Sequence, residues 1–395
     1  MNRISWIIGF WVSVMACAPA QANVEIVDKV DADVRYRLES VAQAGFAEEA
    51  LASTLRARIG VRTRAWQGLH AYLGFEDVRA IGDDRYDSTA NGRTQFPGVA
   101  DPEDTELDQA WLGWSADTMQ LRVGRQRINL DNQRFIGAVG FRQNQQTFDG
   151  ATAQATVAGG TLFYGFLSNA NRVFGEHHPV ATRADLDLDA HLLNYSRSFG
   201  PVTGSAYLYL LEFPDAPAGS QRNLGLRITG EPALGDSPWR IPFAAEYAHQ
   251  SAYADAPGTV SAGYLLAEIG LGRAGGSAKL GYEVLGGDGV YGFATPLATL
   301  HAFNGWADRF LATPAAGLRD RYAQLSQKLG AFDGAATYHD FVSDSGTPDY
   351  GTEWDLAVGK KVCPHSSVRV EYANYRAENF GAHTRIVWFT LQAGF

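Results

Sequence analysis

The sequence predicts an all-β fold: a transmembrane, antiparallel, up-and-down β-barrel of about 18 strands, with short periplasmic turns and long extracellular loops. Three observations support this prediction. The chain begins with an export signal, many segments alternate apolar and polar residues, and the last segment ends in an aromatic residue, Phe395. Each is weak alone, but together they are typical of a chain that is exported and then closes into a barrel.

The last segment, Thr384–Phe395, alternates as a membrane strand requires. Every second residue from Val387 to Phe395 is apolar, while Thr390 and Gln392 fall on the other face. Because side chains of a strand point alternately to opposite faces, this segment has one face suited to lipid and one suited to a lumen. It is similar to the closing strand of bacterial outer-membrane barrels.

The first 22 residues are interpreted as a cleavable signal peptide. Arg3 supplies a positive start, Ile4–Ala18 is almost wholly apolar, and Ala20-Gln21-Ala22 is a small-x-small cleavage site. The apolar run is too short for a stable membrane helix. Lipidation at Cys17 is the alternative, although Met15 fits a lipidation motif poorly. The expected mature chain is one barrel domain over residues 23–395 in the bacterial outer membrane.

Composition fits this interpretation. Alternation of lipid-facing and lumen-facing residues explains a slightly negative mean hydropathy in a membrane protein. The chain has two cysteines, of which Cys17 leaves with the signal, so Cys363 has no partner for a disulfide or a cysteine-based metal site. No cofactor or metal is expected. The net charge of −10 argues against nucleic-acid binding.

The clearest alternation lies in Thr54–Trp66. Leu55, Ile59 and Val61 share one face, and four arginines share the other. A period of two excludes an amphipathic helix. Arginine facing lipid costs roughly 2–4 kcal/mol at the bilayer midplane, so these side chains are expected in the lumen. The other predicted strands are Val34–Glu39, Leu69–Arg79, Glu106–Ser115, Met119–Arg127, Thr147–Val157, Gly160–Ser168, Leu186–Ser198, Val202–Phe213, Arg222–Gly230, Arg240–Gln250, Val260–Leu271, Ser277–Gly286, Arg319–Leu329, Phe332–Val342, Thr352–Lys361, Ser366–Arg376 and Thr384–Phe395.

The connections between these strands alternate in length. With the C-terminus in the periplasm, every second connection comes out as a short periplasmic turn and the others as longer extracellular loops. Only Glu231–Trp239 is long for a periplasmic turn. The longest expected loops are Ser40–Ser53, Ala80–Thr105, Ile128–Gln146, Asn169–Asp185 and Gly287–Leu318.

Two segments resemble the alginate export family of outer-membrane proteins. One is VGRQRINLDNQRFIG, from Val123 to Gly137, with its continuation to Asp149. The other is FATPLATLHAFNGWAD, from Phe293 to Asp308, with its continuation to Asp320. The resemblance implies a single-chain barrel of 18 strands. The best-known member exports a polyuronate through an electropositive lumen and is regulated by a long periplasmic loop. Here Glu231–Trp239 is too short for such a loop, which favours an open or loop-gated diffusion porin.

Arginine dominates the predicted lumen face. A guanidinium is permanently charged and can fork onto a carboxylate, so arginines in a pore favour anions. The hypothesis is a channel for anionic or hydroxylated small solutes, or for polyuronate. The alternatives are a general diffusion porin, in which these arginines pair with lumen acids, and a non-conducting structural barrel or adhesin. The candidate pore-lining residues are Arg56, Arg58, Arg62, Arg64, Arg122, Arg127, Asn129, Asp131, Asn132, Arg134, Arg142, Arg227 and Arg369.

The loop Ile128–Gln146 is predicted to fold inward as a constriction, or else to satisfy its polar groups against the wall. His301, Asn304, Trp306 and Asp308 are expected to lock the second loop in place, with a lining of the vestibule as the alternative. Aromatic residues that face outward near strand ends are expected to form interfacial girdles.

An outer-membrane enzyme is the least favoured hypothesis. His191 and His339 lie on predicted strands, but no Gly-x-Ser-x-Gly or His-Glu-x-x-His motif occurs. His177 and His178 lack a diagnostic metal-ligand spacing. The expected partners are therefore outer-membrane lipid, a small anionic or carbohydrate solute and, for an exporter, a periplasmic protein.

Overall fold

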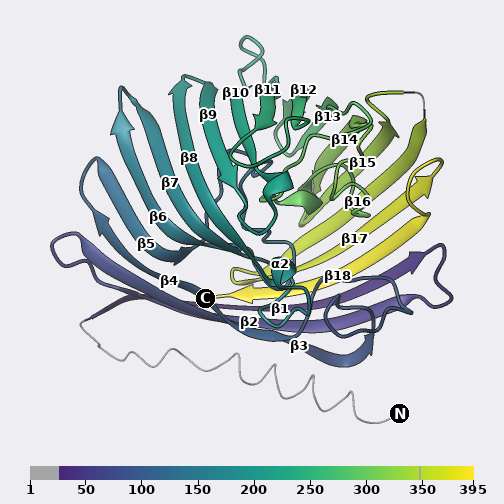
Figure 1. Ribbon diagram of the computed structural model, residues 1–395, viewed down its shortest axis with the longest axis horizontal. Helices are drawn as coiled ribbons and strands as arrows, with labels where there is room; N and C mark the ends of the chain where they lie inside the picture. Colours follow the sequence, from purple (N-terminus) through teal and green to yellow (C-terminus); the bar gives the residue numbers. More distant parts are fainter. Residues whose placement is uncertain (1–25, 347) are drawn as a thin grey trace.

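A computed structural model describes residues 26–346 and 348–395, so the predicted signal peptide lies outside the described residues. All 18 described strands form one antiparallel sheet, in which each strand pairs with its neighbours in the chain. β18 (Thr384–Gly394) also pairs with β1 (Val27–Gln43), so the sheet closes on itself. Figure 1 shows this closure, with yellow β18 beside purple β1. The predicted fold and strand count are confirmed.

The remaining strands follow in chain order. They are β2 (Ala50–Thr63), β3 (Leu69–Arg85), β4 (Asp104–Ser115), β5 (Met119–Gln126), β6 (Thr147–Val157), β7 (Gly160–Asn171), β8 (Asp185–Phe199), β9 (Val202–Glu212), β10 (Gln221–Gly230), β11 (Phe243–Ala252), β12 (Ser261–Arg273), β13 (Gly276–Leu285), β14 (Leu318–Leu329), β15 (Phe332–Val342), β16 (Asp349–Cys363) and β17 (Ser366–Ala377). Short helical turns occur at α2 (Ala181–Ala184), η1 (Pro217–Gly219) and η2 (Leu300–Ala302). No helix in the described part of the chain has both the length and the apolar character needed to cross a bilayer.

The outer face of the sheet is apolar and the inner face is polar. On β2, Ile59 is 55% exposed whereas Arg56 is 1% exposed, and on β3 Phe75 is exposed whereas Glu76 is buried. Leu112 on β4 and Leu226 on β10 continue the exposed apolar surface around the barrel. Soluble proteins rarely expose such a continuous apolar surface, so the outer face is suited to lipid.

Connections differ between the two ends of the barrel. One end, named here the short-turn end, carries turns such as 158–159 and 330–331. The other, the long-loop end, carries 86–103, 127–146 and 286–317. The alternation predicted from the sequence is therefore present, with a turn over 231–242 as the longest at the short-turn end.

Several strand boundaries differ from the prediction. β1 continues to Gln43 and β2 begins at Ala50, so the first loop is only 44–49 rather than Ser40–Ser53. β11 starts at Phe243, because Arg240 belongs to the preceding turn and pairs with Gly272 through two backbone hydrogen bonds of 2.8 Å. These hydrogen bonds hold the 231–242 turn against β12.

Aromatic side chains occupy both faces of the barrel. Trp66, Tyr247 and Trp354 are exposed, as interfacial aromatic residues would be. Several other strand aromatics turn inward and are buried instead: Trp111, Tyr207, Tyr209, Tyr375 and Trp388.

Candidate pore and constriction

The wall formed by β1 and β2 presents a ladder of charged side chains to the lumen. Arg35 and Arg37 are two residues apart on β1, and Arg56 and Arg58 stand in the same way on β2. Arg35 and Arg56 are register partners on the neighbouring strands. Like charges placed this close require partners, and Arg56 pairs with Asp33 while Arg58 pairs with Glu76 of β3.

The 127–146 loop folds into the lumen and is held by this wall. Arg35 Nη1 donates to the carbonyl oxygens of Gly140 and Phe141 at 3.0 and 3.1 Å, and Arg37 Nη1 donates to that of Phe141 at 2.7 Å. Further along, Gln143 donates to Thr54 Oγ1 at 2.9 Å. Because a buried carbonyl needs a donor, the two guanidinium groups fix the position of this loop.

The same loop reaches other parts of the barrel. Asn194 of β8 donates to Asp131 Oδ2 at 2.6 Å. The guanidinium of Arg134, which is buried, lies 3.0 Å from Glu283 Oε1 of β13. The 127–146 loop therefore spans the lumen between wall segments that are distant in the strand order, as a constriction loop would.

The 286–317 loop also enters the lumen. Asn304 donates to Glu283 Oε2 at 2.7 Å, and the backbone N–H groups of Trp306 and Ala307 donate to Asp355 and Glu353 of β16 at 3.2 and 2.7 Å. His301 Nδ1 lies 2.9 Å from Asp308 Oδ1 within the loop. These contacts agree with the predicted locking role of His301, Asn304, Trp306 and Asp308.

Arg142 joins the two loops to each other and to the wall. Its guanidinium lies 2.7 Å from Asp308 Oδ2 and 3.3 Å from Glu39 Oε2 of β1. Next to it, the rings of Phe141 and His301 stack with centroids 3.5 Å apart. Burial lowers the pKa of Arg142, but the carboxylates of Glu39, Asp101 and Asp308 outweigh that effect and raise it. Arg142 is therefore charged at every relevant pH.

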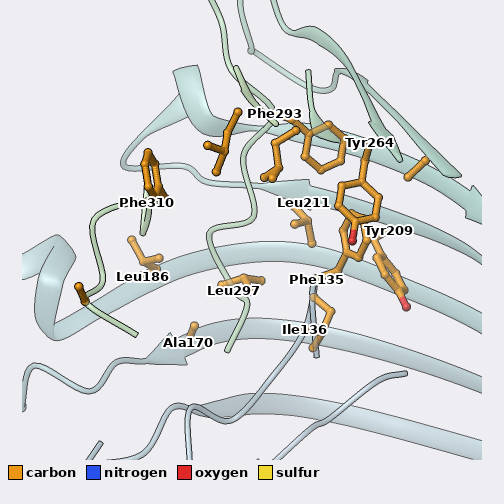
Figure 2. Close-up of a cluster of buried hydrophobic side chains, with 14 of the residues drawn as sticks. Phe135, Ile136, Ala170, Leu186, Tyr209, Leu211, Tyr264, Phe293, Leu297 and Phe310 are labelled. Carbon is orange, nitrogen blue, oxygen red and sulfur yellow. The ribbon is translucent and has the colours of Figure 1, made fainter. Parts of the chain in front are cut away.

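Apolar contacts reinforce the polar ones. Figure 2 shows Phe135 of the 127–146 loop beside the strand residues Tyr209 and Tyr264. The Phe135 ring also lies 5.9 Å from that of Phe293 in the second loop. Aromatic pairs at such distances contribute about 0.5–1.5 kcal/mol each beyond area burial, so the two loops and the wall form one packed unit.

A cavity of about 690 Å³ lies in the lumen against β1–β5, on the short-turn side of the loops. Seven basic side chains line it against three aspartates. The basic residues are Lys29, Arg35, Arg56, Arg58, Arg62, Arg122 and Arg127, and the acidic ones are Asp31, Asp33 and Asp108. We call this space the basic cavity.

Cavities on the opposite side of the barrel are electrically balanced or acidic. One of about 430 Å³ has Asp131 and Arg227 as its charged residues. Another, of about 260 Å³, contains Arg227 and Lys279 with three carboxylates: Glu268, Glu283 and Asp320. Of these three lumen cavities, only the basic cavity has an excess of positive charge.

The predicted site residues fall into three groups. Five line the basic cavity: Arg56, Arg58, Arg62, Arg122 and Arg127. Four line the cavities on the other side: Asn129, Asp131, Asn132 and Arg227. Arg134 and Arg142 are buried in loop contacts, Arg369 pairs with Glu371 at 2.8 Å, and Arg64 lies exposed one residue beyond β2.

Two contributions escaped the sequence reasoning. Arg35 and Arg37 hold the constriction loop through its backbone carbonyl groups, although neither is among the predicted site residues. Tyr72 and Trp111 also line the basic cavity, a role that the alternation of the strands does not indicate. The alternation along each strand predicts whether a side chain faces the lumen or the lipid, but it does not predict which residues that side chain contacts.

The histidines considered for an enzyme have other partners. His191 lies 2.8 Å from the hydroxyl of Tyr164, and His339 lies 2.9 Å from Asp320 Oδ1. Neither ring is hydrogen-bonded to a serine in the described ranges. Among these same residues, no three His, Cys, Asp or Glu side chains are arranged to hold a metal ion.

Comparison with solved structures identifies the architecture. OccK9 (OpdG) of Pseudomonas aeruginosa matches with a TM-score of 0.74 and 15% identity, over 93% of this chain and 97% of that chain. OccAB2 of Acinetobacter baumannii matches with a TM-score of 0.74 and 12% identity, over 94% and 99%. The chain has the fold of the Occ outer-membrane porins. With its apolar outer face, this fold places the protein in the bacterial outer membrane.

The alginate export family model matches residues 28–168, which is less than half of the chain. This range runs from β1 into β7 and contains the basic cavity wall and the first constriction loop. The resemblance seen in the 123–149 segment is therefore confirmed. A comparison with curated proteins gives no match.

Proposed function

We propose that the protein is a diffusion channel for small anions, above all carboxylates, across the outer membrane. The basic cavity carries this proposal, because seven cationic side chains face three aspartates on one wall of the lumen. Rings or ladders of arginine lower the barrier for anions and raise it for cations. The solutes would pass beneath the two inward loops, which limit their size.

Polyuronate export is a weaker candidate. The family match over residues 28–168 favours it, because that range contains the basic wall. The two loops weigh against it, since they meet through Arg142 and Asp308 inside the lumen and leave cavities of a few hundred cubic ångströms. A polymer would require this contact to open. We propose no catalytic role.

The test is the reversal potential of refolded protein in a planar bilayer across a tenfold KCl gradient. An anion channel has a reversal potential close to the Nernst potential of chloride. A potential close to that of potassium contradicts the proposal, and a potential near zero indicates a general porin.

Charge reversal makes the test specific. Arg62→Glu together with Arg122→Glu should move the reversal potential toward that of potassium. The matched control is Arg79→Glu, because Arg79 lies on β3 outside the lumen, exposed and paired with Asp77 at 2.6 Å. Equal shifts in both variants would mean that selectivity does not arise in the basic cavity.

A further inference from the structure

One cation of the basic cavity stands apart from the others. Within the described ranges, the side chain of Arg122 makes no hydrogen bond and no ion pair. Every other cation of the cavity has a partner: Lys29 with Asp31, Arg56 with Asp33, Arg58 with Glu76, Arg62 with Asp28, Arg127 with Asp108, and Arg35 with backbone carbonyls. Arg122 is therefore the guanidinium of this cavity that keeps its whole set of side-chain donors for a solute.

Arg122 is nevertheless held in place. Its guanidinium lies over the ring of Trp111 on the neighbouring strand, with Cζ 4.7 Å from the ring centroid. Trp111 stacks on Tyr72, with centroids 5.6 Å apart and planes at 11°, and His70 meets Trp111 edge-on at 5.5 Å. A guanidinium over an aromatic face is attracted by the ring, and the N–H donors along its edge remain free to bind a ligand.

Glycines let these rings lie against the wall. A Cβ at Gly60 would lie 1.9 Å from the hydroxyl of Tyr72, and one at Gly113 would lie 3.0 Å from the Trp111 ring. At Gly124, where φ is +124°, a Cβ would lie 2.2 Å from the carbonyl oxygen of Ala110. The aromatic floor beneath Arg122 thus depends on positions that accept no side chain, so the floor is fixed before a solute arrives.

We infer that Arg122 is the carboxylate-binding residue of the channel and that the basic cavity is a subsite for small sugar acids. This inference rests on the proposed anion channel. A forked guanidinium matches a planar carboxylate, and the partly exposed Tyr72 ring offers a face for the C–H groups of a sugar. A volume of about 690 Å³ lies within the usual range for small-molecule sites. Arg62 and Arg127 neighbour the site but already have acidic partners.

The experiment measures block of single-channel chloride current by added galacturonate. Arg122→Ala should weaken the block roughly ten- to hundredfold, because a hydrogen bond to a charged group is lost. Arg122→Lys keeps the charge but loses the fork, so anion selectivity should persist while block weakens by severalfold. Arg79→Ala is the matched control, and galacturonate should block its current as strongly as that of the parent. Heat-modifiable migration in gels verifies that each variant is folded.

The outcomes separate the two proposals. If the parent channel prefers anions but galacturonate blocks Arg122→Ala as strongly as the parent, the proposed subsite is wrong. The proposal of an anion channel is then unaffected. If galacturonate blocks Arg122→Lys as strongly as the parent, a positive charge alone is enough for binding, and the proposed forked contact is wrong. Absence of block in an anion-selective parent also overturns the subsite. A parent without anion preference overturns the proposed function itself.

Discussion

Replacement of Arg142 by alanine removes the cation that joins both inward loops to the wall. In the native protein its guanidinium contacts Asp308 at 2.7 Å and Glu39 at 3.3 Å. The side chains of Glu39 and Asp308 are 2% and 8% exposed. The variant therefore leaves two carboxylates buried without their main cationic partner.

The expected cost follows from that burial. Removing one partner of a buried ion pair typically costs about 3–5 kcal/mol, because the other charge stays uncompensated. Since about 1.4 kcal/mol is a tenfold change in an equilibrium constant, the docked state of the loops should lose at least two powers of ten in population relative to undocked states. The Phe141–His301 stack and the Arg35 and Arg37 contacts remain, so the barrel itself should still form.

Single-channel recording measures the result directly. Arg142→Ala should show higher mean conductance and more frequent switching between levels than the parent. The control is Arg85→Ala, because Arg85 pairs with Asp83 in an exposed position, where ion pairs contribute little to stability. If Arg142→Ala has the conductance and noise of the parent, Arg142 does not hold the constriction and the reasoning is refuted.

The same contact predicts a pH dependence. Burial raises the pKa of Asp308, but His301 and Arg142 outweigh that effect and hold the pKa below its usual value of 3.8. A carboxyl group whose folded pKa is depressed stabilises the docked loop fully above its unfolded pKa and loses that contribution as pH falls through the folded value. Conductance should therefore stay constant from neutral pH down to about 4 and rise only below it. A rise near pH 6 would contradict this assignment.

Three other predictions concern the barrel wall and its orientation. Gly60→Ala should lower the free energy of unfolding by about 1–3 kcal/mol in denaturant titrations, and much less in a Tyr72→Ala background, because the new Cβ would meet the Tyr72 hydroxyl. Arg227→Ala should lower the free energy of unfolding by about 3–5 kcal/mol, since it leaves the buried Glu246 without a cation and with only the Tyr207 hydroxyl as donor; a loss below 1 kcal/mol would contradict the pairing. Exposed Cys363, at the short-turn end, should react with an impermeant maleimide in permeabilised cells but not in intact ones, with Cys363→Ser as the control. Labelling in intact cells would reverse the assigned orientation.

The strands were predictable because their pattern is local. In Thr54–Trp66 the alternation of apolar residues with arginine indicated both a strand and its lumen face, and β2 occupies Ala50–Thr63. Strand ends were less predictable. β3 continues to Arg85, where acidic residues such as Asp83 and Asp84 interrupt the apolar period without ending the backbone pairing. Arg64 was assigned to the lumen by parity, but β2 ends one residue before it.

The constriction was only half predictable. Amide and arginine side chains in the Ile128–Gln146 segment indicated an inward loop, and the structure places that loop in the lumen. Its contacts were not predictable, because Arg142 meets residues 103 and 166 positions away in the chain. Such partners come together only when the sheet closes and both loops enter the same space.

The sequence by itself therefore determined the barrel, its strand number and which side chains face inward, since each depends on a period of two along a short segment. Only the tertiary structure decided which arginines form ion pairs within the protein and which one can bind a solute. Arg56, Arg58 and Arg122 look alike in sequence, yet two meet a carboxylate across the wall and Arg122 meets the Trp111 ring. That difference depends on strand register and on how the closed ring of strands shapes the lumen.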